Sequence, residues 1–226
     1  MFDLTHLIAL GIMVVIVVLL SLFKDKFKEK TPDMIFRYTL GSLLFIFETG
    51  FHIWVISRGE YTVDMIPLTG VCAITNILTI IGLFSNNSKL MSISFYWAHI
   101  GAFFSLLFVD VTYVPPHFRF FHYFIVHFGF LLGNIYFYLV DKIHLKRKYI
   151  NLSCLIILGL TLALLPINIM FDKNFYYLLE SPVKEVSDLF GLPLYTILWI
   201  ITIALMLNGV YYMYRGIDKL RHRVLD

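Results

Sequence analysis

Long apolar stretches separated by short polar turns make up most of the sequence. A helix needs about 20 mostly apolar residues to cross a bilayer, and in lipid a helix satisfies its own backbone groups. We therefore expect an all-α, polytopic membrane protein, with residues 1–226 forming a single domain of seven transmembrane helices. The expected spans are 6–23, 34–57, 66–85, 90–111, 118–140, 149–171 and 193–214.

The composition supports this prediction, because 59% of the residues are hydrophobic and the mean hydropathy is +0.81. Soluble domains have a markedly lower apolar content. The first apolar stretch lacks the basic n-region and small-residue cleavage site of a secretory signal. We expect it to be retained as the first span.

Basic residues gather in the loops that follow the first, third, fifth and seventh spans, and cytoplasmic loops are typically enriched in Lys and Arg. The N-terminus is therefore predicted outside and the C-terminus in the cytoplasm. The basic excess is a topology signal, so nucleic-acid binding has no support. Residues 171–193 would form an extracytoplasmic loop, either a lid at the outer interface or a passive connector with aromatic anchors.

Two ionisable residues, Glu48 and His52, lie one turn apart inside the second expected span. Ionisable groups inside the membrane are costly and usually mark functional sites. The pair is either a structural ion pair or part of a polar cavity. A buried ion pair usually stabilises a protein no more than apolar side chains would, so we favour a functional role.

The third expected span carries a stripe of small polar residues at three- and four-residue intervals, namely Thr69, Cys72, Asn76 and Thr79. Such a stripe either packs against other helices or lines a water-filled space. The second cysteine, Cys154, is expected at the opposite end of its span. A disulfide cannot bridge that distance, so both thiols are predicted to be free.

Histidines recur at five-residue intervals in the fifth expected span, which turns successive rings about 140° apart. His122 shares its face with Gly129 and Gly133, a pattern typical of close helix contact. His127 shares its face with Asn134 and is the better candidate for a cavity residue.

These residues suggest nucleophilic chemistry. A thiolate is the reactive form of cysteine, and a neighbouring imidazole can generate it. Cys72 would be the nucleophile and His127 its base, with Glu48 or His52 orienting the base. The residues expected to contact the substrate or its oxyanion are Thr69, Asn76, His122, Asn134 and Asn174. This hypothesis requires no metal ion or other cofactor.

The order of several motifs resembles that of a bacterial family of integral membrane proteins, the YwaF-like proteins. The matching segments are LTHLIAL at 4–10, IPLTGVC at 66–72, FYWAHIGAFFSLLF at 95–108, HFRFFHYFIVHFGFLL at 117–132, and the later NIMFDKNFYYLLESP and LFGLPLYTILW. The family reads Pro-Leu-His-Leu-Cys in the third span. Here Thr69, Gly70 and Val71 stand between Leu68 and Cys72, so that histidine is missing.

The YwaF-like family is similar to eukaryotic transmembrane protein 164, an acyltransferase that acts on ether phospholipids through an intramembrane cysteine and histidine. It is also similar to androgen-inducible lipid hydrolases, which use threonine and histidine. The resemblance implies that Cys72 is the nucleophile and His127 its base. It also implies a multi-pass protein of the bacterial cell membrane whose partner is a membrane phospholipid or another acyl lipid.

The leading hypothesis is therefore an intramembrane lipid acyltransferase or acyl hydrolase whose site opens to the outer leaflet. One alternative is a metal-dependent lipid hydrolase that uses His52, Glu48, His127 and His6. The other is a non-enzymatic lipid transporter or lipid-binding scaffold, which would be indifferent to the loss of Cys72.

Overall fold

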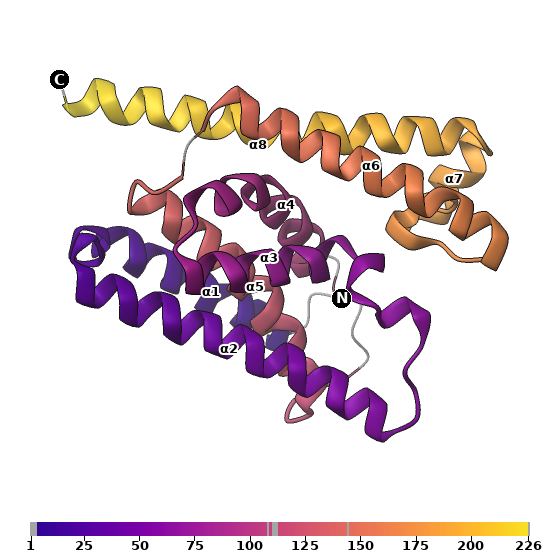
Figure 1. The fold of residues 1–226 in the computed structure, drawn as a ribbon, viewed down its shortest axis with the longest axis horizontal. Helices are drawn as coiled ribbons and strands as arrows, with labels where there is room; N and C mark the ends of the chain where they lie inside the picture. Colours follow the sequence, from indigo (N-terminus) through magenta and orange to yellow (C-terminus); the bar gives the residue numbers. More distant parts are fainter. Residues whose placement is uncertain (1–3, 108, 110–112, 144, 226) are drawn as a thin grey trace. The chain divides into compact units, whose positions relative to one another are not determined.

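The computed structural model describes residues 4–107, 109, 113–143 and 145–225, which fold into helices without any β-strand. The predicted all-α fold is confirmed. The α-helices are α1 (Leu4–Leu22), α2 (Lys30–Ser57), α3 (Val71–Ser85), α4 (Ser88–Leu107), α5 (Phe118–Leu139), α6 (Arg147–Phe171), α7 (Lys184–Phe190) and α8 (Leu194–Leu225) (Figure 1). Short 3-10 turns cover Lys24–Lys28, Val63–Met65, Pro67–Thr69 and Phe175–Tyr177.

Within the described part of the chain, six helices are long and apolar enough to cross a membrane: α1, α2, α4, α5, α6 and α8. They coincide with six of the seven predicted spans. The predicted end of the fourth span at residue 111 lies outside the described residues, and α8 continues well past the predicted end at 214. The number of spans and the orientation stay predictions.

The predicted helix over 66–85 is wrong at its start, because α3 begins only at Val71 and has 15 residues. The residue before a proline avoids the helical region, and Ile66, which precedes Pro67, is extended with φ −66° and ψ 129°. Residues Pro67–Thr69 form a 3-10 turn, and Gly70 is again extended. Helix α3 therefore spans only about 22 Å, and Cys72 lies in its first turn.

The chain divides into two compact units. Unit 1 comprises Met1–Thr62 and Cys72–His144, and unit 2 comprises Val63–Val71 and Leu145–Asp226. The expectation of a single domain stays a prediction.

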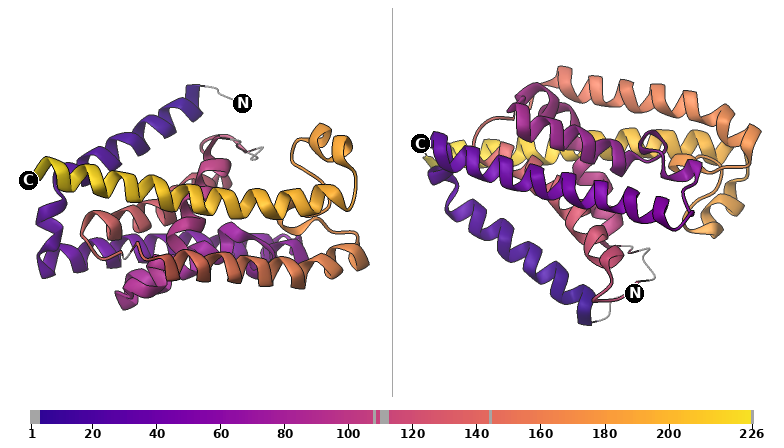
Figure 2. Two further views of the ribbon diagram at one scale, coloured as in Figure 1. Left: turned by 90° about the horizontal axis from the view of Figure 1, so that it is seen from above. Right: turned by 60° about the horizontal axis from the view of Figure 1, so that its bottom comes forward.

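Helix α5 is the central helix of unit 1 and contacts α1, α2 and α4 (Figures 1 and 2). A Cβ atom on Gly129 would lie 2.5 Å from Cδ2 of Leu44, and one on Gly133 would lie 2.9 Å from Cγ2 of Thr79. Two glycines therefore let α5 approach α2 and α3 closely, which confirms the predicted role of this face.

A buried ionic cluster ties one end of α2 to α3 and α5. The carboxylate of Asp33 accepts bonds from Arg37 Nε at 3.1 Å, from the hydroxyl of Tyr136 at 2.6 Å and from the ammonium of Lys142. Arg37 also donates to the carbonyl of Leu83 at 2.6 Å. Each charge has an opposite partner, as buried charges require, so this cluster has a structural role.

In unit 2, α6 and α8 lie side by side, and the segment between them returns the chain from one to the other (Figure 1). This segment contains the Phe175–Tyr177 turn and α7. Its carbonyls accept hydrogen bonds from side chains of both long helices: Asn168, Tyr195, Thr196 and Trp199. The lid function of residues 171–193 stays a prediction, and opening such a lid would break these bonds.

Candidate functional site

The thiol of Cys72 lies between the start of α3 and the C-terminal part of α4. Its sulfur is 3.6 Å from the hydroxyl oxygen of Ser105. A Cβ atom on Gly101 would lie only 3.2 Å from the same sulfur and 3.8 Å from Cζ of Phe130. The glycine therefore gives the thiol its space, one turn before Ser105 and against a ring of α5.

The position of Cys72 in the first turn of α3 has an electrostatic consequence. The first N–H groups of a helix have no partner within it, and they form the positive end of the helix dipole. A thiolate at such an end is stabilised. The late start of α3 thus places the thiol at this end of the helix.

His127 approaches this region from α5 through Tyr123. The hydroxyl of Tyr123 donates to the backbone carbonyl of Ser105 at 2.6 Å. Nδ1 of His127 lies 2.8 Å from the carbonyl of Tyr123. A carbonyl only accepts, so Nδ1 carries the hydrogen and Nε2 of the neutral ring carries a lone pair. The geometry makes Nε2 a proton acceptor.

Cys72 and His127 are not hydrogen-bonded to each other, because the sulfur's partner among the described residues is Ser105. They share neighbours instead. The ring centroid of His127 is 5.6 Å from that of Phe130, and Phe130 borders Gly101 beside the sulfur.

A second group of polar side chains surrounds the carboxylate of Glu48. Oε2 accepts a hydrogen bond from Nδ2 of Asn76 at 3.0 Å and lies 3.6 Å from Nε2 of His122. Oε1 lies 3.4 Å from Nε2 of His52. We call Glu48, His52, Asn76 and His122 the carboxylate cluster. It joins α2, α3 and α5.

Arg119 fixes the tautomer of His122. Its Nη1 lies 2.5 Å from Nδ1 of His122, and a guanidinium only donates, so Nδ1 accepts. The hydrogen of the neutral ring is then on Nε2, facing Glu48. The guanidinium also lies over Phe51, 4.6 Å from the ring centroid, and Phe51 stacks on His122 at 4.6 Å.

The three residues of the predicted triad therefore belong to two groups: Cys72 and His127 share neighbours, whereas Glu48 belongs to the carboxylate cluster. Glu48 contacts His52 and His122 rather than His127. For His122 the sequence predicts both close helix packing and a contact with the substrate; in the structure its ring belongs to the carboxylate cluster. Arg119 was not among the candidates, although its position three residues before His122 places both on one face of a helix.

Asn134 is placed as a packing residue. Its amide donates to the hydroxyl of Thr79 at 3.0 Å and to the carbonyl of Phe130 at 2.8 Å, and its carbonyl accepts from Ser94 at 3.1 Å. The side chain is fully buried. The polar stripe of α3 thus has two uses, since Thr79 packs between helices while Asn76 joins the carboxylate cluster.

Two further candidates, Thr69 and Asn174, belong to unit 2 and bond to their own loops. The hydroxyl of Thr69 donates to the carbonyl of Ile66 at 2.7 Å. The side-chain oxygen of Asn174 accepts from the backbone of Leu179 and Glu180 at 3.0 and 3.2 Å. Their polar groups stabilise local turns.

The residues of the metal hypothesis do not form one group. Among the described residues, no three His, Cys, Asp or Glu side chains are placed to hold a metal ion. His6 is buried, with Nε2 2.7 Å from the carbonyl of Leu106 and its ring centroid 5.8 Å from that of Phe124. Nδ1 of His127 bonds to a carbonyl of its own helix. Of the four residues in the metal hypothesis, His52 and Glu48 are the two in contact.

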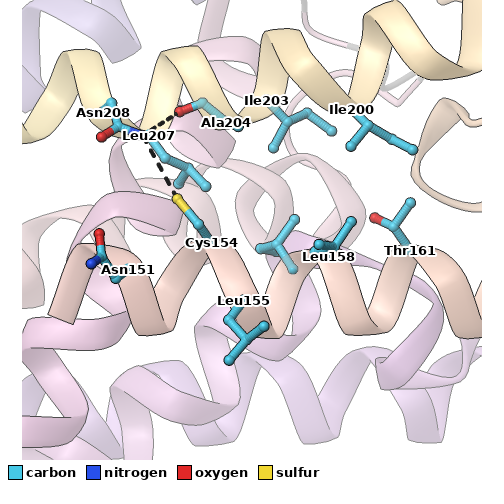
Figure 3. Close-up of a pocket in the computed structure, with 11 residues that line it drawn as sticks. Asn151, Cys154, Leu155, Leu158, Thr161, Ile200, Ile203, Ala204, Leu207 and Asn208 are labelled. Carbon is cyan, nitrogen blue, oxygen red and sulfur yellow. Dashed lines mark hydrogen bonds between the residues drawn. The ribbon is translucent and has the colours of Figure 1, made fainter. Parts of the chain in front are cut away.

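Unit 2 contains a groove of about 390 Å³ between α6 and α8 (Figure 3). Its walls are apolar except for Asn151, Cys154, Thr161 and Asn208. The amide of Asn208 donates to the sulfur of Cys154 at 3.8 Å. Both Cys72 and Cys154 are free thiols, as predicted. The groove contains none of the predicted site residues.

Comparison with known protein families identifies a match over most of the chain. The sequence model of the TMEM164 family matches residues 1–214. No curated protein and no solved structure matches the chain.

Proposed function

The chain belongs to the TMEM164 family, and from this membership and the geometry of unit 1 we propose that it is an intramembrane lipid acyltransferase or acyl hydrolase. Family membership and the apolar helices are consistent with a lipid-related function in a membrane. The substrate would be a membrane phospholipid or another acyl lipid. Cys72 would be the nucleophile and His127 the base.

The observation that carries the proposal is the position of Cys72. The thiol lies in the first turn of α3, its sulfur 3.6 Å from Ser105, with space provided by Gly101. A helix N-terminus stabilises a thiolate, and the hydroxyl of Ser105 can donate to one. Cys154, in contrast, lies eight positions into its helix with an amide as its partner.

The first half of the reaction follows from these groups. The thiol proton passes to Nε2 of His127, and the sulfur attacks the carbonyl carbon of a lipid ester. A C–S bond forms, the C–O bond breaks, and the imidazolium gives its proton to the departing alkoxide. The products are an acyl thioester on Cys72 and a lipid alcohol.

The oxyanion of this step has donors close to the sulfur. Of the amides first considered, Asn76 is bonded to Glu48, and Asn174 is bonded within its loop. The backbone N–H groups of the first turn of α3, which have no acceptor within the helix, would take this role. A helix N-terminus stabilises such developing negative charge.

The test is acyl transfer by purified protein in lipid nanodiscs that contain a radiolabelled phospholipid donor. We expect Cys72→Ala to abolish transfer, and His127→Asn to lower it by about 10²- to 10⁴-fold, the usual contribution of an acid–base group. Cys154→Ala is the matched control and should retain full activity. Full activity of Cys72→Ala or of His127→Asn would refute the mechanism.

A further inference from the structure

Among the residues that the structure describes, two buried polar atoms of the carboxylate cluster have no hydrogen-bond partner within 3.5 Å. They are Oδ1 of Asn76 and Nε2 of His122, and the latter lies 3.6 Å from Oε2 of Glu48. Both residues are more than nine-tenths buried. Nδ2 of Asn76 and Nε2 of His122 approach the same oxygen, Oε2 of Glu48, at 3.0 and 3.6 Å. Leaving such groups unsatisfied costs free energy, so their position indicates a small polar ligand.

The roles of the two atoms are fixed by their other contacts. A carboxylate only accepts, so Asn76 turns its NH₂ toward Glu48 and offers Oδ1 as an acceptor. Arg119 holds Nδ1 of His122, so Nε2 offers a hydrogen. The ligand must therefore donate one hydrogen bond and accept another.

A hydroxyl group meets this requirement. An ester or ketone oxygen only accepts, and an ammonium group only donates. A phosphate or carboxylate would be repelled by the charge of Glu48. The hydroxyl can come from a lipid alcohol or from water.

We propose that Glu48, Asn76 and His122 bind the hydroxyl that accepts the acyl group from Cys72. The inference rests on the proposed function. Asn76 follows Cys72 by four residues in α3, which places the two side chains about 6 Å apart on one helix face. The hydroxyl is thus held one turn from the thioester.

In the second half of the reaction, the acyl group passes from Cys72 to the bound hydroxyl. The bound hydroxyl donates to Oδ1 of Asn76 and accepts from Nε2–H of His122. As its oxygen attacks the thioester carbonyl carbon, the hydrogen turns from Asn76 to Oε2 of Glu48, which takes the proton. A C–O bond forms and the C–S bond breaks. The sulfur leaves as a thiolate and takes up the proton held by Glu48. A lipid alcohol gives a new ester, and water gives a free fatty acid.

The test separates loading of Cys72 from release of the acyl group. Protein in nanodiscs is loaded from a phospholipid donor, and acyl-Cys72 is followed by intact-mass spectrometry. Release is then measured with monolauroylglycerol as the alcohol, or without it in ¹⁸O-labelled water. New ester identifies the alcohol as the source of the hydroxyl, and ¹⁸O-labelled fatty acid identifies water.

The variants His122→Asn and His122→Gln form a matched pair, because Asn keeps an acceptor near the Nδ1 position and Gln keeps an N–H near the Nε2 position. We expect His122→Asn to load Cys72 within about threefold of the unchanged protein and to release the acyl group about 100-fold more slowly, as for a lost oxyanion donor. His122→Gln should release it within about 10-fold of the normal rate, because it keeps the donor to the attacking hydroxyl. Release is expressed per loaded molecule, so misfolded protein does not count.

Asn76→Leu gives an independent measurement and should slow release as His122→Asn does. Normal release in His122→Asn, or equal loss of loading and release, would overturn the inference and leave Cys72 as the nucleophile. Absence of acyl-Cys72 in the unchanged protein would refute the proposed function, and the inference with it.

Discussion

The sulfur of Cys72 and the hydroxyl oxygen of Ser105 lie 3.6 Å apart, which joins the first turn of α3 to α4. A hydrogen bond to a charged group contributes about 1.5–3 kcal/mol. Ser105→Ala should therefore lower the rate at which a lipid-tailed maleimide labels Cys72 by about 10-fold or more. Ser105→Thr keeps the hydroxyl and should label normally. An unchanged rate in Ser105→Ala would show that the hydroxyl does not support the thiolate.

Asn134 distinguishes packing from substrate binding. Its side chain bonds to Ser94 and Thr79 and is fully buried. Hydrogen bonds between membrane helices contribute about 0.6 kcal/mol on average and up to about 1.7. Asn134→Leu should lower the free energy of unfolding, measured by titration with a denaturing detergent, by about 1–2 kcal/mol. Activity per folded molecule should stay normal. A selective loss of activity would return Asn134 to the substrate cavity.

The close contact at Gly129 predicts a large effect from a small change. A methyl group there would meet Leu44 at 2.5 Å, and overpacking a core costs about 1–3 kcal/mol. Gly129→Ala should lower the thermal midpoint of the detergent-solubilised protein. Gly159→Ala is the matched control, because a Cβ atom there meets nothing within 4 Å. Equal midpoints for the two variants would contradict this packing.

The ionic cluster around Asp33, at the N-terminal end of α2, should be sensitive to the loss of one charge. Asp33→Asn leaves Arg37 and Lys142 facing each other without a carboxylate, and breaking a buried pair costs about 3–5 kcal/mol. The free energy of unfolding should fall by that order. Asp25→Asn removes an exposed partner of Lys28 and should change it by less than about 1 kcal/mol. A small effect of Asp33→Asn would show that the cluster is solvated.

The orientation can be tested with single cysteines in a protein that carries Cys72→Ala and Cys154→Ala. Lys146 and Lys184 are exposed residues on loops predicted to lie on opposite faces of the membrane. An impermeant maleimide added to intact cells should label Lys184→Cys, and should label Lys146→Cys only after the membrane is opened. The reverse pattern would invert the predicted topology.

The helices were predictable because each must be long and apolar to cross a bilayer, and six of the seven predicted spans coincide with such helices. The start of α3 was misplaced, although Pro67 and Gly70 were visible signals of a break. Sequence spacing gives the angle of a side chain about its own helix, so the shared faces of Glu48 and His52 and of Gly129 and Gly133 could be inferred.

What spacing cannot give is the rotation of one helix against another. For this reason the sequence suggests that Glu48 orients His127, whereas in the structure the ring beside Glu48 is that of His122. The hydrogen-bond partner of Cys72 was equally out of reach, since Ser105 lies on a helix whose serines are spread over several faces. The structure brings Glu48, His52, Asn76 and His122 together, and spacing alone does not reveal which of these side chains contact one another.

The short length of α3 sets the depth of the reactive thiol. The helix ends at a turn where Asn86 accepts a 3.0 Å bond from the ammonium of Lys142, and a lysine at a helix end reaches for the interface. We therefore expect the missing length, about 8 Å against a hydrocarbon core of about 30 Å, to fall at the Cys72 end. The sulfur would then lie beneath the level at which glycerolipids carry their ester carbonyls. An acyl lipid would have to dip toward it by about that distance, and a water-soluble thioester would have to enter the bilayer first.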